Sequence, residues 1–287
     1  MRSTHSLNRN LPSPRKLDPR WKPIGIVARK AFVALFFVAV TSSVHAGSVF
    51  IEELTWKEVS DQIAQGKTTA IIFAGSTEQN GLHMVLGKHN YIARHLAQRL
   101  AIELGDALVY PVFPFAPTGD TLTRTGHMRF AGSVNVNESL FAAVIGEIAL
   151  SAISSGFKLI LLMGDHGGGQ GALASLAKRL DEQTRQSGIR VFHLSAIYDS
   201  TETPPTDMPQ GLAFDQLAHA GVLDTASLMA IDAGRRWVRA AQMSAAAAAN
   251  GADENPSAAS AEMGQQLLAR RVSAALLQVH KLVGDKP

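Results

Sequence analysis

The fold is decided by one stretch of this sequence, Ala70-Ile-Ile-Phe-Ala74 followed by Gly75-Ser-Thr-Glu78-Gln-Asn-Gly-Leu-His83-Met-Val-Leu-Gly-Lys-His89-Asn90. The apolar run predicts a strand, and a helical pattern begins after Asn90. Between them lie one carboxylate, two imidazoles and two amides. In an open α/β sheet, ligands bind at the carboxyl ends of the strands. We therefore expect this segment to contribute to a binding site.

Apolar runs alternate with longer amphipathic segments along the rest of the chain, which is typical of βαβ units and a mainly parallel sheet. The predicted strands are Thr69–Ala74, Leu108–Val112, Leu159–Met163 and Arg190–Leu194. The predicted helices are Trp56–Gln65, Tyr91–Leu104, Glu138–Ser155, Gly171–Ser187 and Asp224–Asp232, and a last helix that runs through Leu282. Two turn-rich passages, at 114–134 and 199–213, are long enough to be functional or disordered.

The first 46 residues have the features of a signal peptide or leader. Basic residues up to Lys30 precede an apolar run from Ala31 to Val40, and Val44-His45-Ala46 is the kind of small-residue pattern that signal peptidase cuts. The apolar run is too short to span a bilayer. We therefore predict cleavage near Ala46, export to the periplasm or secretion, and a single α/β domain over residues 47–287. An uncleaved N-terminal anchor is the alternative.

The charge of the chain divides at the same place. The leader holds eight of the 27 Lys and Arg residues but only one of the 24 Asp and Glu residues, so the remainder has a formal net charge of −4. That balance gives no sign of nucleic-acid binding. Cysteine is absent, which excludes disulfides and thiolate metal sites and leaves His, Asp and Glu as the metal ligands to consider.

Three further segments combine glycine with ionisable residues where a strand should end: Gly126–Ser133, Gly164–Gly171 and His219–Asp224. If the sheet is parallel, all of them can lie at the same edge as the first segment. Glycine lets the backbone approach a ligand closely, so His166 beside three glycines indicates a crowded site.

One carboxylate and two imidazoles, those of Glu78, His89 and His166, form a plausible metal-binding set that leaves coordination positions open for water and substrate. Other interpretations stay open. A single loop histidine is more often a hydrogen-bonded structural residue, and the glycine-rich segment could bind phosphate at a helix N-terminus. A serine esterase using Ser76 or Ser133 is disfavoured, because the sequence has no Gly-x-Ser-x-Gly turn.

Taken together, the segments resemble the creatininase family of metal-dependent amidohydrolases. Gly75–His83 is similar to Gly-Ser-x-Glu-Gln-His-Gly-Pro-His, and Met163–Gln170 to Asn-Gly-His-Gly-Gly-Asn-Gln. Phe130–Ser133 stands where Phe-Pro-Gly-Thr is usual, and His219–Thr225 resembles His-Ala-Gly-x-x-Glu-Thr. The order and spacing match from about residue 51 to residue 229. The resemblance implies a creatininase-like, three-layer α/β/α fold and a homo-oligomer.

Three departures from the family pattern concern the metal ligands. This chain has Asn80 in place of a His, His89 in place of an Asp that bridges two metals, and Gly168 in place of a Glu. A neutral imidazole has one coordinating nitrogen and no charge, so His89 cannot bridge two divalent ions. The resemblance therefore implies one divalent ion per chain, zinc or else manganese, held by Glu78, His89 and His166.

The resemblance also suggests roles for other residues. Asp224 is the candidate acid or base for proton transfer to the leaving nitrogen, and His219 is the candidate for stabilising an oxyanion or moving a proton. Asp165 could be a further ligand or could orient an imidazole, and capping of the next helix is the alternative. Asn80 is a candidate for supporting the site or the substrate, and His127 could line the substrate pocket or lie on the surface.

Two functions follow from these observations. The first is hydrolysis of a C–N bond in a small cyclic or linear amide by an exported enzyme with one metal ion. The second is a catalytically degenerate periplasmic protein that binds a ligand or metal without turnover, which the changes at Asn80, His89 and Gly168 favour. In either case we expect a small-molecule ligand, no nucleic acid and no stable membrane span after cleavage.

Overall fold

A computed structural model describes residues 47–200 and 218–284 of the chain. The predicted leader, 1–46, and most of the second turn-rich passage lie outside the described residues. The description below concerns the unit that begins at His45.

The centre of the fold is a four-stranded sheet formed by β1 (Thr69–Ala74), β2 (Ala107–Val109), β3 (Leu159–Gly164) and β4 (Arg190–His193). The strand order is β2-β1-β3-β4, and every neighbouring pair is parallel. β1 and β3 are buried along their whole length, which explains why their sequences are apolar throughout and do not alternate.

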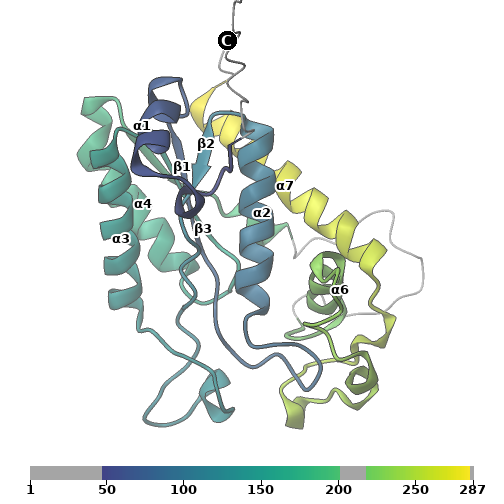
Figure 1. Ribbon diagram of the computed structural model, residues 1–287. Helices are drawn as coiled ribbons and strands as arrows, with labels where there is room; N and C mark the ends of the chain where they lie inside the picture. The colour runs from purple at the N-terminus through teal and green to yellow at the C-terminus, as the bar shows by residue number, and fades with distance from the viewer. Residues whose placement is uncertain (1–46, 201–217, 285–287) are drawn as a thin grey trace, which may run out of the picture. The chain divides into compact units, whose positions relative to one another are not determined.

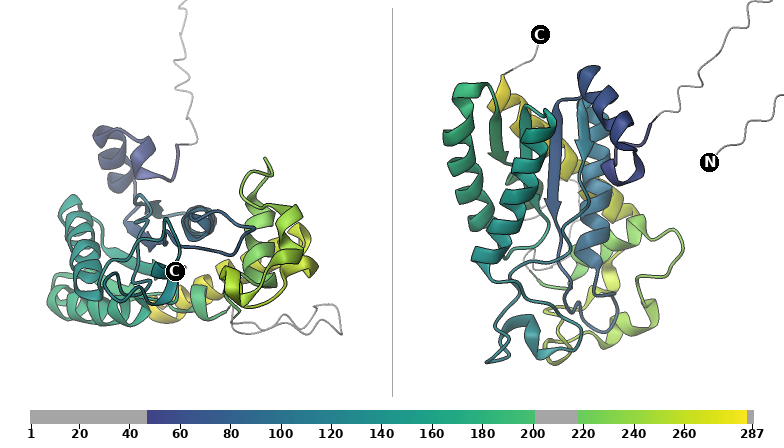
Figure 2. Two further views of the ribbon diagram at one scale, coloured as in Figure 1. Left: turned by 90° about the horizontal axis from the view of Figure 1, so that it is seen from below. Right: turned by 60° about the vertical axis from the view of Figure 1, so that its left-hand side comes forward.

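Helices cover both faces of this sheet (Figures 1 and 2). On one face, Ile71 and Phe73 of β1 pack in a core with α2 (Lys88–Leu104), α7 (Ala261–Val283) and α5 (Ala196–Asp199). On the other face, Ala70 and Ile72 pack with α3 (Glu138–Ser155) and α4 (Gln170–Thr184), and α1 (Trp56–Ala64) lies at the margin of that core. Successive strand residues point to opposite faces, so one strand serves both cores. The predicted three-layer α/β/α fold is confirmed.

The remaining elements are α6 (Val222–Ile231), which packs on α7, and six short 3₁₀ helices. The 3₁₀ helices among the described residues are Ile51–Glu53, Gly126–Arg129, Arg185–Ser187, Ala240–Ala245, Ala248–Asn250 and Pro256–Ala258. By length and composition alone α3 could cross a membrane, but its buried side chains, including Phe141 and Ile145, pack against the sheet.

The predicted elements are present in the structure, with boundaries that agree to within about three residues, and the differences at β2 and α2 have consequences for the site. β2 ends at Val109 and not at Val112, although the chain continues beside β1 through Tyr110 and Phe113. Pro111 and Pro114 have no N–H to donate, so a regular strand ends there. α2 begins three residues earlier than predicted, which places Lys88 and His89 in its first turn.

The contact between α6 and α7 depends on Gly264. A Cβ atom at this position would lie 1.9 Å from the backbone oxygen of Ala226, so only glycine allows the two helices to approach so closely. We predict that Gly264→Ala lowers the free energy of unfolding by about 1–3 kcal/mol through overpacking. Gly171→Ala in α4 is the matched control, since nothing lies within 4 Å of its Cβ. Urea denaturation measures both, and equal stabilities of the two variants would contradict the prediction.

Candidate metal centre

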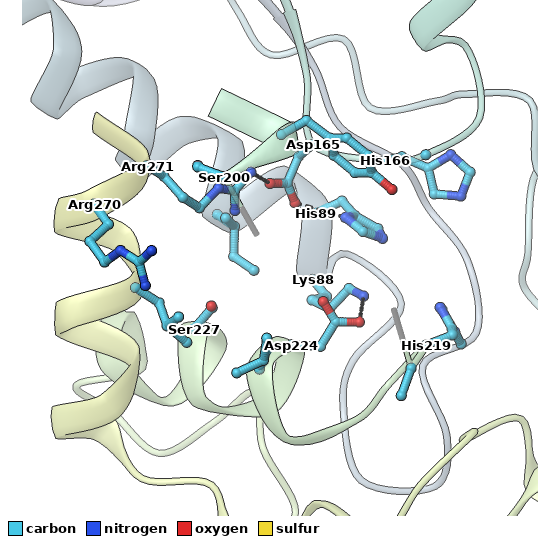
Figure 3. A pocket seen from close by; sticks show the side chains of 16 residues that line it. Lys88, His89, Asp165, His166, Ser200, His219, Asp224, Ser227, Arg270 and Arg271 are labelled. Carbon is cyan, nitrogen blue, oxygen red and sulfur yellow. Dashed lines mark hydrogen bonds and ion pairs between the residues drawn. The ribbon is translucent and has the colours of Figure 1, made fainter. Parts of the chain in front are cut away.

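The parallel sheet brings the predicted segments to one edge. β1 leads into the segment with Glu78 and α2, while β3 leads into Asp165 and His166. His219 and Asp224 reach the same place from the segment that begins α6. Figure 3 shows the side chains of Asp165, His166, His219 and Asp224 around one cavity. The sequence prediction that these segments meet at one edge is therefore confirmed for the described residues.

Glu78 lies at the centre of the cluster, and its side chain is fully buried. Its Oε1 is 3.0 Å from Nε2 of His89, and its Oε2 is 2.8 Å from Nε2 of His166. Burial raises the pKa of Glu78, but the hydrogen bonds and charges of His166 and His89 outweigh burial and hold the pKa well below its usual range. Glu78 is therefore an ionised carboxylate inside the protein.

His89 lies between two carboxylates. Its Nδ1 is 2.7 Å from Oδ2 of Asp165, on the side of the ring opposite Glu78. Burial and the charge of Lys88 lower the pKa of His89, but the hydrogen bonds to Asp165 and Glu78 and the charge of Glu78 raise it by more. A neutral ring has one N–H, which can donate to only one of the two carboxylates. The other ring nitrogen then faces its carboxylate with a lone pair, and this contact is favourable only if a second proton or a metal ion lies between the two atoms.

This donor set fits a divalent metal. If His89 donates Nδ1–H to Asp165, the lone pair on Nε2 faces Glu78, and a cation between the two atoms would satisfy both. Nδ1 of His166 lies near two backbone groups of Gly168. It can accept the N–H at 3.0 Å, which places the ring proton on Nε2 toward Glu78, or it can donate to the carbonyl oxygen at 3.3 Å, which frees the lone pair of Nε2 for a metal ion. The ligand atoms of Glu78, His89 and His166 all lie within 4.8 Å of one another.

A second group of possible ligands shares Glu78. Nε2 of His127 lies 3.6 Å from Oε2, and Nδ1 of His219 lies 3.8 Å from Oε1. The side-chain amide of Gln79 makes His127 unsuitable as a ligand of this second group. Its Oε1 accepts the N–H of Gly81, so its Nε2 donates to Nδ1 of His127 at 3.0 Å and leaves the ring's only proton on Nε2. In that tautomer His127 faces Glu78 as a donor and not as a metal ligand.

His219 is held in one tautomer as well. Its Nε2 is 2.9 Å from the backbone oxygen of Gln79, which can only accept, so Nε2 carries the proton and the unprotonated Nδ1 faces Glu78. Burial and the charge of Lys88 lower the pKa of His219 to about 4. The ring is therefore neutral near pH 7 and can accept a proton at Nδ1.

Asp224 forms an ion pair with Lys88, whose side chain is fully buried. Burial raises the pKa of Asp224, but the Lys88 charge holds it well below its usual range. Asp224 therefore lines the cavity as an ionised carboxylate, which can accept a hydrogen bond but is a weak base and a poor proton donor near pH 7. Sequence reasoning missed Lys88. Its only local signal was a cation at the start of a helix, where the helix dipole disfavours positive charge.

Asp165 contacts His89 and not its chain neighbour His166. Its Oδ1 also accepts a hydrogen bond of 2.5 Å from Arg271 of α7. The capping alternative does not hold, because the N-cap of α4 is Gly169 and no side chain caps it. Arg271 carries no local sequence signal, because its role appears only when α7 packs beside the strand ends.

The positions that depart from the family pattern have structural roles here. Asn80 donates to the backbone oxygens of Glu78 and Val85, at 2.8 and 3.2 Å, and so holds its own loop. At Gly168 a Cβ atom would lie 2.0 Å from the backbone oxygen of Pro117, which leaves no room for a side chain. Gly168 therefore offers no metal ligand, whereas Oδ1 of Asn80 is buried and has no hydrogen-bond partner among the described residues.

The cavity beside the cluster has a volume of about 240 Å³. Its lining includes Lys88, His89, His166, His219 and Asp224. This size and polarity suit a small polar molecule.

His127 is half-buried and contacts Gln79, whereas Arg129 is exposed and donates a hydrogen bond to the backbone oxygen of Gly126.

Comparison with known proteins gives one family. The family model "Creatininase: Creatinine amidohydrolase" matches residues 52–278. The chain is 24% identical to a creatinine amidohydrolase of Pseudomonas putida over 64% of its own length and 72% of that protein's. It is 28% identical to a mycofactocin precursor peptide peptidase of Mycobacterium tuberculosis, over 52% of this chain and 60% of the peptidase.

Solved structures give the same fold. A crystal structure of creatinine amidohydrolase is similar with a TM-score of 0.71, at 22% identity, over 83% of this chain and 99% of the other. A mutant creatininase of Zn-Zn type and a creatininase with Mn are similar with TM-scores of 0.68 and 0.69, each at 22% identity over 82% of this chain and 98% of the other.

The raised pKa of His89 predicts a pH dependence for the metal-free protein. The contribution of His89 to stability is fully present below about pH 6.5, the ordinary pKa of histidine. It is lost as the pH rises through the raised value in the folded state. The described histidines with lowered pKa values are neutral in this window; they are His83, His95, His127, His193 and His219.

We therefore expect the free energy of unfolding, measured by urea denaturation with a chelator present, to fall above pH 6.5 in the wild type. The fall should be much smaller in His89→Gln. His95→Gln is the control, because His95 lies outside the cluster. A fall of the same size in His89→Gln would show that another group causes it.

Proposed function

The chain belongs to the creatininase family, and from this premise we propose that it is a metal-dependent amidohydrolase that cleaves a C–N bond in a small cyclic or linear amide. The observation that carries the proposal is the buried carboxylate of Glu78 between Nε2 of His89 and Nε2 of His166, at 3.0 and 2.8 Å. These three residues would hold the ion. The name of the Pseudomonas putida relative supports a C–N bond as the target.

One divalent ion per chain is the count that we propose. A second ion is disfavoured by the lack of space for a side chain at Gly168 and by the tautomer of His127. Zinc is the first candidate for this set of one carboxylate and two imidazoles, with manganese as the alternative. Both metals occur among the structurally similar creatininases.

When bound, the ion would supply a Lewis acid that polarises the amide carbonyl and lowers the pKa of a water molecule toward about 7. The protein would supply the rest. His219, neutral and unprotonated at Nδ1, would accept a proton within the cavity. Asp224, kept ionised by Lys88, would accept a hydrogen bond from an N–H of the substrate.

The alternative function is ligand or metal binding without turnover. It is favoured by the ion pair of Asp224 with Lys88, because a carboxylate held in this way is a weak proton donor for a leaving nitrogen. We also propose an exported, periplasmic or secreted location and a homo-oligomeric state. The features of residues 1–46 and the family resemblance support these two proposals.

Metal content tests the proposed site. We expect about one zinc ion per chain after reconstitution and dialysis, measured by elemental analysis. Glu78→Gln and His166→Asn should retain much less, since each removes a ligand from a three-ligand set. Glu182→Gln, at an exposed position of α4, is the control. Two ions per chain would contradict the proposed count, and no bound metal in the wild type would contradict a metalloenzyme.

Activity separates the two functions. We expect the zinc-loaded wild type to release amine or ammonia from at least one member of a panel of small lactams, cyclic ureides and linear amides. Glu78→Gln should lower that rate by about 100-fold or more, because a Lewis acid contributes several kcal/mol to the barrier and 1.36 kcal/mol is tenfold. One zinc per chain with saturable binding but no hydrolysis would favour the binding protein.

A further inference from the structure

Three residues from distant parts of the sequence are joined by a series of hydrogen bonds that ends at His89. Arg271 of α7 donates from a terminal guanidinium nitrogen to Oδ1 of Asp165 at 2.5 Å, and Oδ2 of Asp165 contacts Nδ1 of His89 at 2.7 Å. All three residues are buried. Figure 3 shows Arg271 directed from α7 toward Asp165, with His89 beyond it.

The arrangement fixes Arg271 at two points. Its Nε donates to the backbone oxygen of Ile197 in α5 at 2.7 Å, while the terminal nitrogen reaches Asp165. A planar guanidinium can span two acceptors in this way, whereas the single ammonium of a lysine cannot reproduce that fork. Arg271 therefore holds Asp165 in one orientation and leaves Oδ2 as the oxygen that faces His89.

Asp165 and Glu78 compete for the single proton of a neutral His89 ring. The contact with Asp165 is the shorter, at 2.7 Å against 3.0 Å for Glu78. With the proton on Nδ1, the lone pair of Nε2 points to Glu78, and both atoms are available to a cation. With the proton on Nε2, His89 would donate to Glu78. Nε2 would then have no lone pair for a metal ion, and the oxygen of Glu78 would already be occupied by the hydrogen bond.

We propose that Asp165 and Arg271 are positioning residues that fix the Nδ1–H tautomer of His89, so that the C-terminal helix α7 is a working part of the metal centre. Residues that hydrogen-bond a ligating histidine typically change metal affinity by 10–100-fold when they are mutated. The proposal rests on the proposed metal-dependent function for its effect on affinity, whereas its claim about the tautomer holds with or without metal.

Zinc affinity tests the effect on the metal centre. Competition against a chromophoric chelator should show binding that is 10–100-fold weaker in Asp165→Asn and at least tenfold weaker in Arg271→Lys. The ion pair of the half-buried Asp181 with the exposed Arg190 provides matched controls. Asp181→Asn and Arg190→Lys make the same chemical changes away from the site and should stay within about threefold of the wild type. Affinities of Asp165→Asn and Arg271→Lys within that range would overturn the proposal.

Imidazole nitrogen NMR of histidine-labelled, metal-free protein tests the tautomer directly, at a pH where the His89 ring is neutral. We expect the proton of His89 on Nδ1 in the wild type. A proton on Nε2 would overturn the proposal even if the variants failed to fold. A wild type that binds no zinc but shows Nδ1–H, lost in Asp165→Asn, would reject the metal-dependent function and keep the positioning role.

Discussion

The ionised carboxylate of Glu78, buried at the end of the central strand, is the constraint on which the rest of the site depends. A carboxylate removed from water is costly unless cations or hydrogen bonds compensate it. Here Ser76 donates a hydrogen bond, and Nε2 of His127 faces the carboxylate with its proton. Ring nitrogens of His89, His166 and His219 also lie within 4 Å of its oxygens, and a proton or a metal ion there would compensate the charge. The surrounding loops are arranged so that nitrogen atoms converge on this one group.

Carboxylates alternate with their hydrogen-bond or ion-pair partners outward from that centre. On one side the order is Glu78, His89, Asp165 and Arg271, and on the other the Asp224 carboxylate is matched by the Lys88 ammonium. Buried charges that are paired in this way restrict the geometry that the site can adopt, because moving one partner leaves another unpaired. The first turn of α2 carries both Lys88 and His89. Its position is therefore held by the ion pair with Asp224 and by the hydrogen bonds of His89.

Local sequence was enough to predict β1 and α3 at their observed bounds, because a strand buried on both faces and a long apolar helix each have a clear pattern. It was also enough to bring Glu78, His89 and His166 together, since strand ends of a parallel sheet share one edge. The partners of the acidic residues could not be predicted in the same way. Asp165 contacts His89, 76 positions away, and Arg271 contacts Asp165 from 106 positions away. Such pairs depend on how helices pack and not on any neighbouring residue.

The contact between Arg271 and Asp165 has a consequence for the order in which the protein matures. A chain emerging from the ribosome completes its strands first, and α7 is the last element to appear. Until Arg271 has been synthesised and has docked, Asp165 lacks the partner that orients it, and the cluster around Glu78 is unfinished. In the proposed metal centre, a cation would therefore meet the complete set of positioning contacts only after α7 has docked.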